Sequence, residues 1–262
     1  MNQALWISKT GLDAQQTRMN VVSNNLANVN TTAFKKGRAS FEDLIYQTIR
    51  QPGAQEAQNN QLPTGLMTGV GVRTVATDKI FTQGNHTQTD NALDVSIQGR
   101  GFFEILTPEG NVAYTRDGSF QLNADGQMVM SNGYELQPGI FIPEGTKSIH
   151  IGQDGIVSAT LAGQEDAPVE VGNIQLADFV NPAGLEPVGQ NLFVETAASG
   201  APQQGNPGQD GLGRLMQGSL ESSNVNIAEE LVNMIETQRA YEINSKSIST
   251  SDQMMQFLNQ NL

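Results

Sequence analysis

Hydrophobic positions near the start of the chain recur with a helical period. Positions 5, 8, 12, 15, 19, 22, 26 and 29 are separated alternately by three and four residues, and only Ser8 and Gln15 among them are polar. This 3.5-residue spacing is typical of the seam of a coiled coil. The pattern predicts an N-terminal helix whose seam packs against other helices through Leu5, Leu12, Met19, Val22, Leu26 and Val29.

The C-terminal end repeats this pattern from position 227 to position 255. Asn226 is a suitable N-cap, and Glu229 and Glu230 are acidic residues where the helix dipole favours them. Gln238, Ser245 and Asp252 interrupt the seam at regular intervals, so a pair of two helices would be weak. We therefore expect contacts with several partners through Ile227, Leu231, Met234, Tyr241, Ile248 and Met255.

The long middle of the chain has the pattern of strands and turns. Short apolar and β-branched runs predict strands at 94–98, 102–106, 149–151, 156–159, 174–179, 192–195 and 215–220. Asp-Gly or Asn-Gly pairs follow at 117–118, 125–126, 132–133 and 154–155, and these pairs favour hairpins with type I′ turns. The region from 91 to 221 is therefore predicted to be a β domain rich in hairpins.

Two stretches lack any regular period. Residues 51–68 are rich in Gln and turn-forming residues, and 201–213 are rich in Pro, Gly and Gln.

We expect the chain to divide into four segments: an N-terminal helix at 1–36, an extended connector at 37–90, a β domain at 91–221 and a C-terminal helix at 222–262. The predicted fold class is α+β, with a discontinuous coiled-coil-like domain formed by both ends and a central all-β domain.

Charge and composition narrow the classes of partner. The net charge is −13, and the longest basic cluster is KKGR at 35–38, which argues against nucleic acid and against an anionic membrane surface. No stretch approaches the roughly 20 apolar residues of a membrane span, and the first 29 residues lack the pattern of a secretory signal. The absence of cysteine excludes disulfides and thiolate metal sites.

Candidate chemistry is sparse. His86 and His150 lack a metal-ligand partner at helical spacing, and structural or surface roles fit them better. The pairs Gly69/Gly71 and Gly99/Gly101 lack the third glycine of a dinucleotide fingerprint, so turns or bulges are the better interpretation. The sequence therefore predicts no catalytic residue, cofactor site or metal site, and it does not indicate an enzyme.

Four segments resemble the axial proteins of the bacterial flagellum, the rod and hook family. They are SNNLANVNTTAFKK at 23–36, LDVSIQGRGFF at 93–103, AYTRDGSF at 113–120 and SNVNIAEELVNMIETQRAYE at 223–242, and they occur in the family order. The stretch YQTIRQPGAQ at 46–55 is similar to an insertion, here about 46–63, that is typical of distal rod subunits. One departure is Ala33, where the family motif commonly has Gly; a positive φ there would strain the backbone.

The resemblance implies a structural subunit of the distal rod that self-assembles into a rigid hollow tube and transmits torque from motor to hook. It implies a location in the basal body, crossing the periplasm, and no catalysis. The implied partners are further copies of the chain, the proximal rod, hook and hook-junction proteins, the surrounding ring proteins and the flagellar type III export apparatus. It also implies export without a cleaved signal peptide, and terminal helices that become ordered only on assembly.

One short motif bears on export. FEDLI at 41–45 is similar to a Phe-x-x-x-apolar motif of early export substrates, which would give Phe41 and Ile45 a recognition role, although both could equally be core residues.

Three alternatives remain for the function of the chain: a hook or proximal rod subunit, a dimeric helical stalk, and a secreted β-rich binding module, such as an adhesin, carried on such a stalk.

Overall fold

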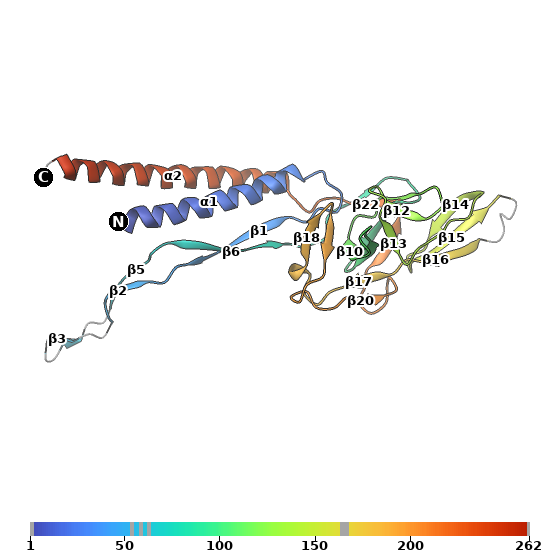
Figure 1. Ribbon diagram of the computed structural model, residues 1–262, viewed down its shortest axis with the longest axis horizontal. Helices are drawn as coiled ribbons and strands as arrows, with labels where there is room; N and C mark the ends of the chain where they lie inside the picture. The colour runs from blue at the N-terminus through green and yellow to red at the C-terminus, as the bar shows by residue number, and fades with distance from the viewer. Residues whose placement is uncertain (1–2, 53–54, 58–59, 62–63, 163–167, 261–262) are drawn as a thin grey trace. The chain divides into compact units, whose positions relative to one another are not determined.

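The computed structural model describes residues 3–52, 55–57, 60–61, 64–162 and 168–260, which form two compact units. Unit 1 comprises Met1–Ala27, Gly37–Lys79 and Asn226–Leu262, and unit 2 comprises Asn28–Lys36 and Ile80–Val225. Helices at the two ends and many strands between them confirm the predicted α+β class (Figure 1).

Unit 1 contains the two long helices. Helix α1 covers Gln3–Ala27 and helix α2 covers Ile227–Gln260. The predicted cap of α2 is present, since the side-chain oxygen of Asn226 accepts the Ala228 N–H at 3.0 Å. This bond satisfies one of the backbone donors that every helix N-terminus leaves without an intrahelical partner.

An antiparallel ribbon completes unit 1. Strand β1 (Gly37–Asp43) pairs with β6 (Val72–Lys79), β2 (Gln47–Arg50) pairs with β5 (Leu66–Thr68), and β3 (Gln55–Ala57) pairs with β4 (Asn60–Gln61). Its base is tied to α1, because the Asn25 side chain accepts the Gly37 N–H and donates to the Gly37 carbonyl, at 2.8 and 2.9 Å. The region predicted to be an extended connector therefore includes paired strands.

Unit 2 is built around a nine-stranded sheet with the order β11-β12-β13-β9-β10-β19-β18, to which β17 and β20 add beside β9. A three-stranded sheet, β14-β15-β16, and the pairs β8–β21 and β7–β22 complete the unit. The strands are β7 His86–Gln88, β8 Val95–Gln98, β9 Phe102–Leu106, β10 Val112–Thr115, β11 Phe120–Leu122, β12 Met128–Met130, β13 Glu135–Gln137, β14 Thr146–Ile151, β15 Ile156–Leu161, β16 Val169–Asn173, β17 Leu176–Asp178, β18 Glu186–Gly189, β19 Leu192–Val194, β20 Gln203–Gly205, β21 Arg214–Gln217 and β22 Ser219–Glu221, with a short 3-10 helix at Pro182–Gly184.

The strands of unit 2 enclose two clusters of buried apolar side chains. Phe103 and Phe120 pack edge to face with ring centroids 5.2 Å apart, and Tyr114 packs edge to face on Phe179 at 4.8 Å. Such aromatic pairs stabilise a fold by more than their buried area. The fully or almost fully buried side chains include Val95, Ile97, Phe103, Ile105, Phe120, Met128, Leu136, Ile140, Val157, Ile174 and Leu176.

The turns correct two predictions about the hairpins. The pairs at 125–126, 132–133 and 154–155 do connect antiparallel strands, but only the glycine of each pair has positive φ, so none is a type I′ turn. In the hairpin between β18 and β19, both turn residues, Gln190 and Asn191, have positive φ. A polar side chain such as that of Asn tolerates the left-handed region better than most.

The predicted hairpin at Asp117-Gly118 is wrong. The flanking strands β10 and β11 do not pair with each other. Gly118 instead serves a close approach of two backbones: its carbonyl accepts the Val95 N–H at 3.0 Å, and a Cβ there would lie 1.7 Å from the Val95 carbonyl oxygen.

Candidate subunit interface

The seam between the two helices of unit 1 consists mainly of small and polar side chains. On α1 the buried positions are Ser8, Ala14, Val22 and Asn25, and on α2 they include Glu230, Thr237 and Ser251. Ser8 Oγ lies 3.3 Å from Ser247 Oγ, and Asn25 donates to Glu230 at 3.3 Å. Small residues bring the helices close, so that a Cβ on Gly11 would lie 3.2 Å from the Asn244 side chain.

One charged contact joins the second half of α1 to the N-terminal third of α2. Arg18 Nη2 lies 3.4 Å from Asn233 Oδ1 and 3.8 Å from a carboxylate oxygen of Glu236. Both charged side chains are substantially exposed, and exposed ion pairs contribute roughly 0–1 kcal/mol. The seam thus aligns the helices without burying most of their large apolar side chains.

Those large side chains face solvent instead. On α2, Ile227, Leu231 and Ile235 are each about half exposed, and exposure persists toward the C-terminal end of the helix. The exposed large apolar residues of both helices are Trp6, Ile7, Ile227, Leu231, Val232, Ile235, Tyr241, Ile243, Met254, Met255 and Phe257. A stable monomer rarely exposes so much apolar surface without a partner for it.

The residues predicted to contact other subunits differ in exposure. Ile227, Leu231, Tyr241 and Met255 are exposed, whereas Val22 is buried. A groove of about 320 Å³ in unit 1 brings Met19 and Tyr241 together with Gln16, Gln238 and Glu242. The remaining predicted members are half-buried: Leu5, Leu12, Leu26, Val29, Met234 and Ile248.

The sequence pattern missed part of this surface. Trp6, Ile7, Val232, Ile235 and Ile243 lie outside both predicted seams yet are exposed. The signal was present, because apolar residues on these helices extend beyond a single stripe, as on helices that contact neighbours on several sides.

The ribbon adds a second apolar surface. Ile45 is 85% exposed, and Tyr46, Ile49, Leu66 and Met67 are each at least half exposed. Phe41 lies in β1 and is 36% exposed. Neither member of the Phe41/Ile45 motif is a core residue, and the segment is not helical, so the alternative role for this motif as buried core is wrong.

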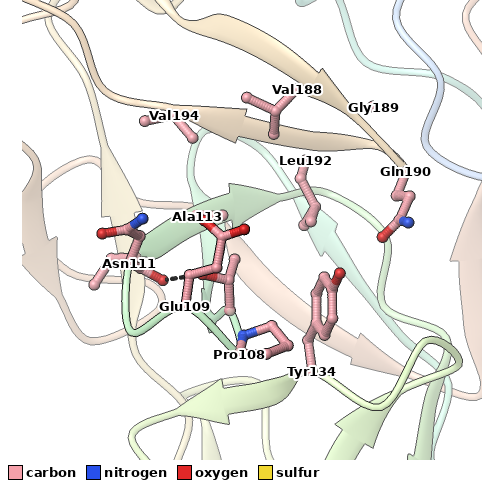
Figure 2. A pocket seen from close by; sticks show the side chains of 12 residues that line it. Pro108, Glu109, Asn111, Ala113, Tyr134, Val188, Gly189, Gln190, Leu192 and Val194 are labelled. Carbon is pink, nitrogen blue, oxygen red and sulfur yellow. Dashed lines mark hydrogen bonds between the residues drawn. The ribbon is translucent and has the colours of Figure 1, made fainter.

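Unit 2 has a groove of about 360 Å³ beside β10 and the β18–β19 hairpin (Figure 2). Its wall includes Tyr134, Val188 and Leu192, while Glu109 and Asn111 lie on the loop between β9 and β10. Glu109 and Tyr134 are the titratable residues of its lining, and no nucleophile and base are paired there. The groove therefore offers a mixed apolar and polar contact surface.

Unit 2 also buries a charged cluster. Lys35 Nζ lies 2.5 Å from Glu221, both side chains are fully inaccessible, and Arg116 Nε lies 3.5 Å from the other Glu221 oxygen. Burial lowers the pKa of Lys35, and Glu221 opposes this change. Burial also lowers the pKa of Arg116, again against the effect of Glu221. The sequence showed Lys35 only as part of a basic cluster and could not show its carboxylate partner.

Two kinds of site are absent from the described ranges. No helix among them is long and apolar enough to cross a membrane. Within the same part of the chain, His, Asp and Glu side chains do not gather in a group that could hold a metal ion.

Three family models match successive parts of the chain. Residues 6–35 match "Flagella basal body rod protein", residues 96–159 match "Flagellar hook protein FlgE/F/G D1 domain", and residues 216–261 match "Flagellar basal body rod FlgEFG protein C-terminal". The matches therefore include sequence from both structural units.

Whole-length relatives agree. The chain is 58% identical to "Flagellar basal-body rod protein FlgG" of Buchnera aphidicola subsp. Schizaphis graminum over 99% of this chain and 100% of that protein. It is 50% identical to the protein of the same name from Borreliella burgdorferi, over 99% of this chain and 98% of that protein. It is 30% identical to "Flagellar hook-basal body complex protein FlhP" of Bacillus subtilis, over 99% of both.

Proposed function

This chain belongs to the flagellar basal-body rod protein family, and we propose that it polymerises through its terminal helices and ribbon into the distal rod. In this role it is a structural subunit that transmits torque from motor to hook and catalyses no reaction. The tube would cross the periplasm. Its neighbours would be further copies, the proximal rod, hook and hook-junction proteins and the surrounding ring proteins.

The observation that carries the proposal is that the helices pack on each other through one set of residues and expose another set. A seam of small and polar residues aligns α1 with α2, while Leu231, Ile235 and Ile243 remain exposed. Burying one such side chain fully gains about 1.5–3 kcal/mol. The exposed large apolar residues of α2 occur along most of its length and do not lie on a single stripe. Neighbours on several sides of the helix are therefore needed to cover them. Head-to-tail contacts of this kind generate filaments where closed symmetry would stop growth.

Electron microscopy of the concentrated full-length protein tests this proposal. Ammonium sulfate strengthens apolar burial and should promote assembly. The control lacks residues 1–27 and 226–262 and retains 28–36, which belong to unit 2. Straight tubes from the full chain alone are expected. Curved tubes would favour a hook-type subunit, and dispersed particles in both samples would favour a binding module on a stalk.

The terminal helices should become ordered during assembly. Their intramolecular seam is narrow, and isolated helices without a large packed face are marginal in water. Helix α1 has 25 residues and α2 has 34, so far-UV circular dichroism resolves their folding. We expect a weak helical signal in dilute monomer and a strong one in tubes. A strong monomer signal that persists on mild heating would contradict this expectation.

Phe41 and Ile45 are proposed to be recognised by the export apparatus. Support comes from their exposure, because a recognition motif must be accessible. Replacement of both by Ala should reduce the amount of chain secreted by flagellated cells at least tenfold. Val75→Ala, on the exposed face of β6, is the matched control. Secretion of the double variant at the level of the control would refute the export role.

A further inference from the structure

The chain passes between its two units four times, after residues 27, 36, 79 and 225. Unit 2 is therefore made of one short piece, Asn28–Lys36, and one long piece, Ile80–Val225. At three of these crossings the chain enters or leaves unit 2 through segments that are distant in sequence. These segments end at Lys36, begin at Ile80 and end at Val225. Any load passed along the chain between the units must run through such segments.

Within unit 2, one asparagine joins all three segments. Asn224 Oδ1 accepts the Lys36 N–H at 2.7 Å, and Asn224 Nδ2 donates to the carbonyls of Ile80 and Thr82 at 2.8 and 3.1 Å. The side-chain amide thus uses its acceptor and both of its donors. Backbone bonds reinforce the connection, since Ile80 N–H donates to Lys36 O at 2.9 Å and Asn224 N–H donates to Phe34 O at 3.3 Å.

The buried ion pair joins the same three segments a second time. Lys35 bonds Glu221 at 2.5 Å and donates to Thr82 O at 2.9 Å. Glu221 also accepts the Gly84 N–H at 2.8 Å through its side chain and the Ala33 N–H at 2.7 Å through its carbonyl. Members of this network are separated in sequence by up to 188 residues.

Stability alone is a weak reason for such an arrangement. Replacing a buried ion pair by apolar residues of similar volume is often neutral or stabilising, whereas a paired charge fixes its partners in one geometry. The Asn224 amide uses its acceptor and both donors, and satisfied polar networks make an interior rigid and specify a single arrangement. In the charged network, Glu221 Oε2 faces Arg116 Nε at 3.5 Å as an ion pair without a hydrogen bond. Two networks that meet at the Thr82 carbonyl and join the same three segments therefore indicate a requirement for fixed position.

We propose that Asn224 and the Lys35–Glu221 pair form a clamp that makes three of the chain segments at the boundary of unit 2 move as one. A twisting load then divides among the three segments instead of stretching each in turn. This mechanical role rests on the proposed function as a torque-transmitting rod subunit, but the clamp itself is a property of the single chain.

Hydrogen exchange of the purified full-length protein, measured by mass spectrometry, tests the clamp. Asn224→Ala removes the acceptor of the Lys36 N–H and both bonds to the segment at Ile80 and Thr82. Exchange in peptides covering 33–37 and 80–84 should become at least tenfold faster, while a peptide covering β9 and β10 remains unchanged. Asn132→Ala is the control, because Asn132 donates to Gln190 at 3.0 Å between two exposed loops.

A second variant guards against a folding defect of the first. Lys35→Met removes the bonds to Glu221 and to Thr82 O and leaves Glu221 as the charged partner of Arg116 and the acceptor of the Gly84 N–H. It should also accelerate exchange in these peptides at least tenfold. Exchange within twofold of the wild-type rate in both variants would overturn the clamp. These results hold whether or not tubes form, so they are independent of the test of the proposed function.

Load dependence in cells tests the mechanical role. Cells carrying Asn224→Ala as their only copy should swim in dilute medium and stop at a viscosity in which Asn132→Ala cells still swim. Equal swimming of both strains at high viscosity would overturn load sharing. Basal bodies that lack rods in Asn224→Ala and in Lys35→Met would also overturn it, in favour of a role in assembly.

Discussion

The two units of this chain treat large apolar side chains in opposite ways. Unit 2 encloses them, and Ile97, Phe103 and Leu136 are fully buried among neighbours from several strands. Unit 1 places small and polar residues between its helices and leaves Leu231 and Ile235 in contact with water. Burial of apolar area drives both folding and association; in unit 2 it stabilises the fold, and in unit 1 the exposed area remains available for the proposed association.

Charge follows the same division. Most of the net charge of −13 lies in unit 2, whereas acidic and basic residues nearly balance in unit 1. Self-repulsion grows with net charge, so the nearly neutral unit is the one whose copies pack closely at the lowest electrostatic cost. The comparison teaches that unit 2 buries a large apolar core within a single chain, whereas unit 1 leaves many of its large apolar side chains exposed, as the proposed polymer requires.

The largest expected effect concerns the core of unit 2. Phe103→Ala removes a fully buried ring that packs on Phe120, and it should lower the free energy of unfolding by about 3–5 kcal/mol. Urea unfolding followed by near-UV circular dichroism of tyrosine measures this loss. Phe141→Ala, at a side chain that is 58% exposed, should stay within about 0.5 kcal/mol of wild type. Equal losses of unfolding free energy in the two variants would contradict the expected difference between buried and exposed apolar residues.

The next effect concerns assembly and not the stability of the monomer. Ile235→Asp places a charge on the exposed face of α2 and should raise the protein concentration needed for tubes at least tenfold, or about 1.4 kcal/mol. The free energy of unfolding of unit 2 should be unchanged. Sedimentation of tubes over a concentration series measures the threshold, with the exposed Gln253→Asp on the same helix as control. An unchanged threshold would remove Ile235 from the interface.

A smaller effect concerns the backbone of unit 2. Ala33 has φ 58°, the strained conformation foreseen from its family motif, and its N–H donates to Glu221 O at 2.7 Å. Ala33→Gly relieves a strain of about 1–2 kcal/mol and adds chain entropy to the unfolded state worth about 0.4–1 kcal/mol. The net gain should be about 0.5–1 kcal/mol in urea unfolding. Ala124→Gly, an exposed position without positive φ, should instead cost a few tenths of a kcal/mol.

The last effect is absent at neutral pH and appears only at alkaline pH. Burial, with Glu104 and Glu195 nearby, raises the pKa of Tyr114 to about 12. The unfolded chain loses this proton near pH 10, while the folded chain keeps it, so stability should fall as the pH rises from about 10 to about 12. Tyr114→Phe should remove that part of the decline. Melting temperatures between pH 9 and 12 measure it, and Tyr134→Phe is the control.

The sequence predicted the helices and strands better than it predicted the contacts between them. Spacing at the two ends predicted both helices, and Asn226 was identified as the cap of α2. Short strands such as those at 102–106 and 156–159 were predicted because apolar runs ended in turn residues. Hairpins at 125–126 and 132–133 were also predicted, but not their turn type, since φ at the first residue of each pair depends on how the flanking strands meet.

Three features left no readable signal. The ribbon of unit 1 is solvated along much of both faces, so its strands lack the alternation that marks a half-buried strand. The helix seam depends on which face meets which partner, and a period of 3.5 residues does not distinguish an intramolecular seam from an intermolecular one. The pairing of Lys35 with Glu221 joins residues 186 positions apart, which charge alone cannot predict.

The hydrogen bond from Asn224 to the Ile80 carbonyl has an evolutionary consequence. It places the two ends of the long piece Ile80–Val225 side by side, as in a domain inserted into a loop of another. Such a piece can be lengthened, shortened or exchanged without moving the ends it is attached to.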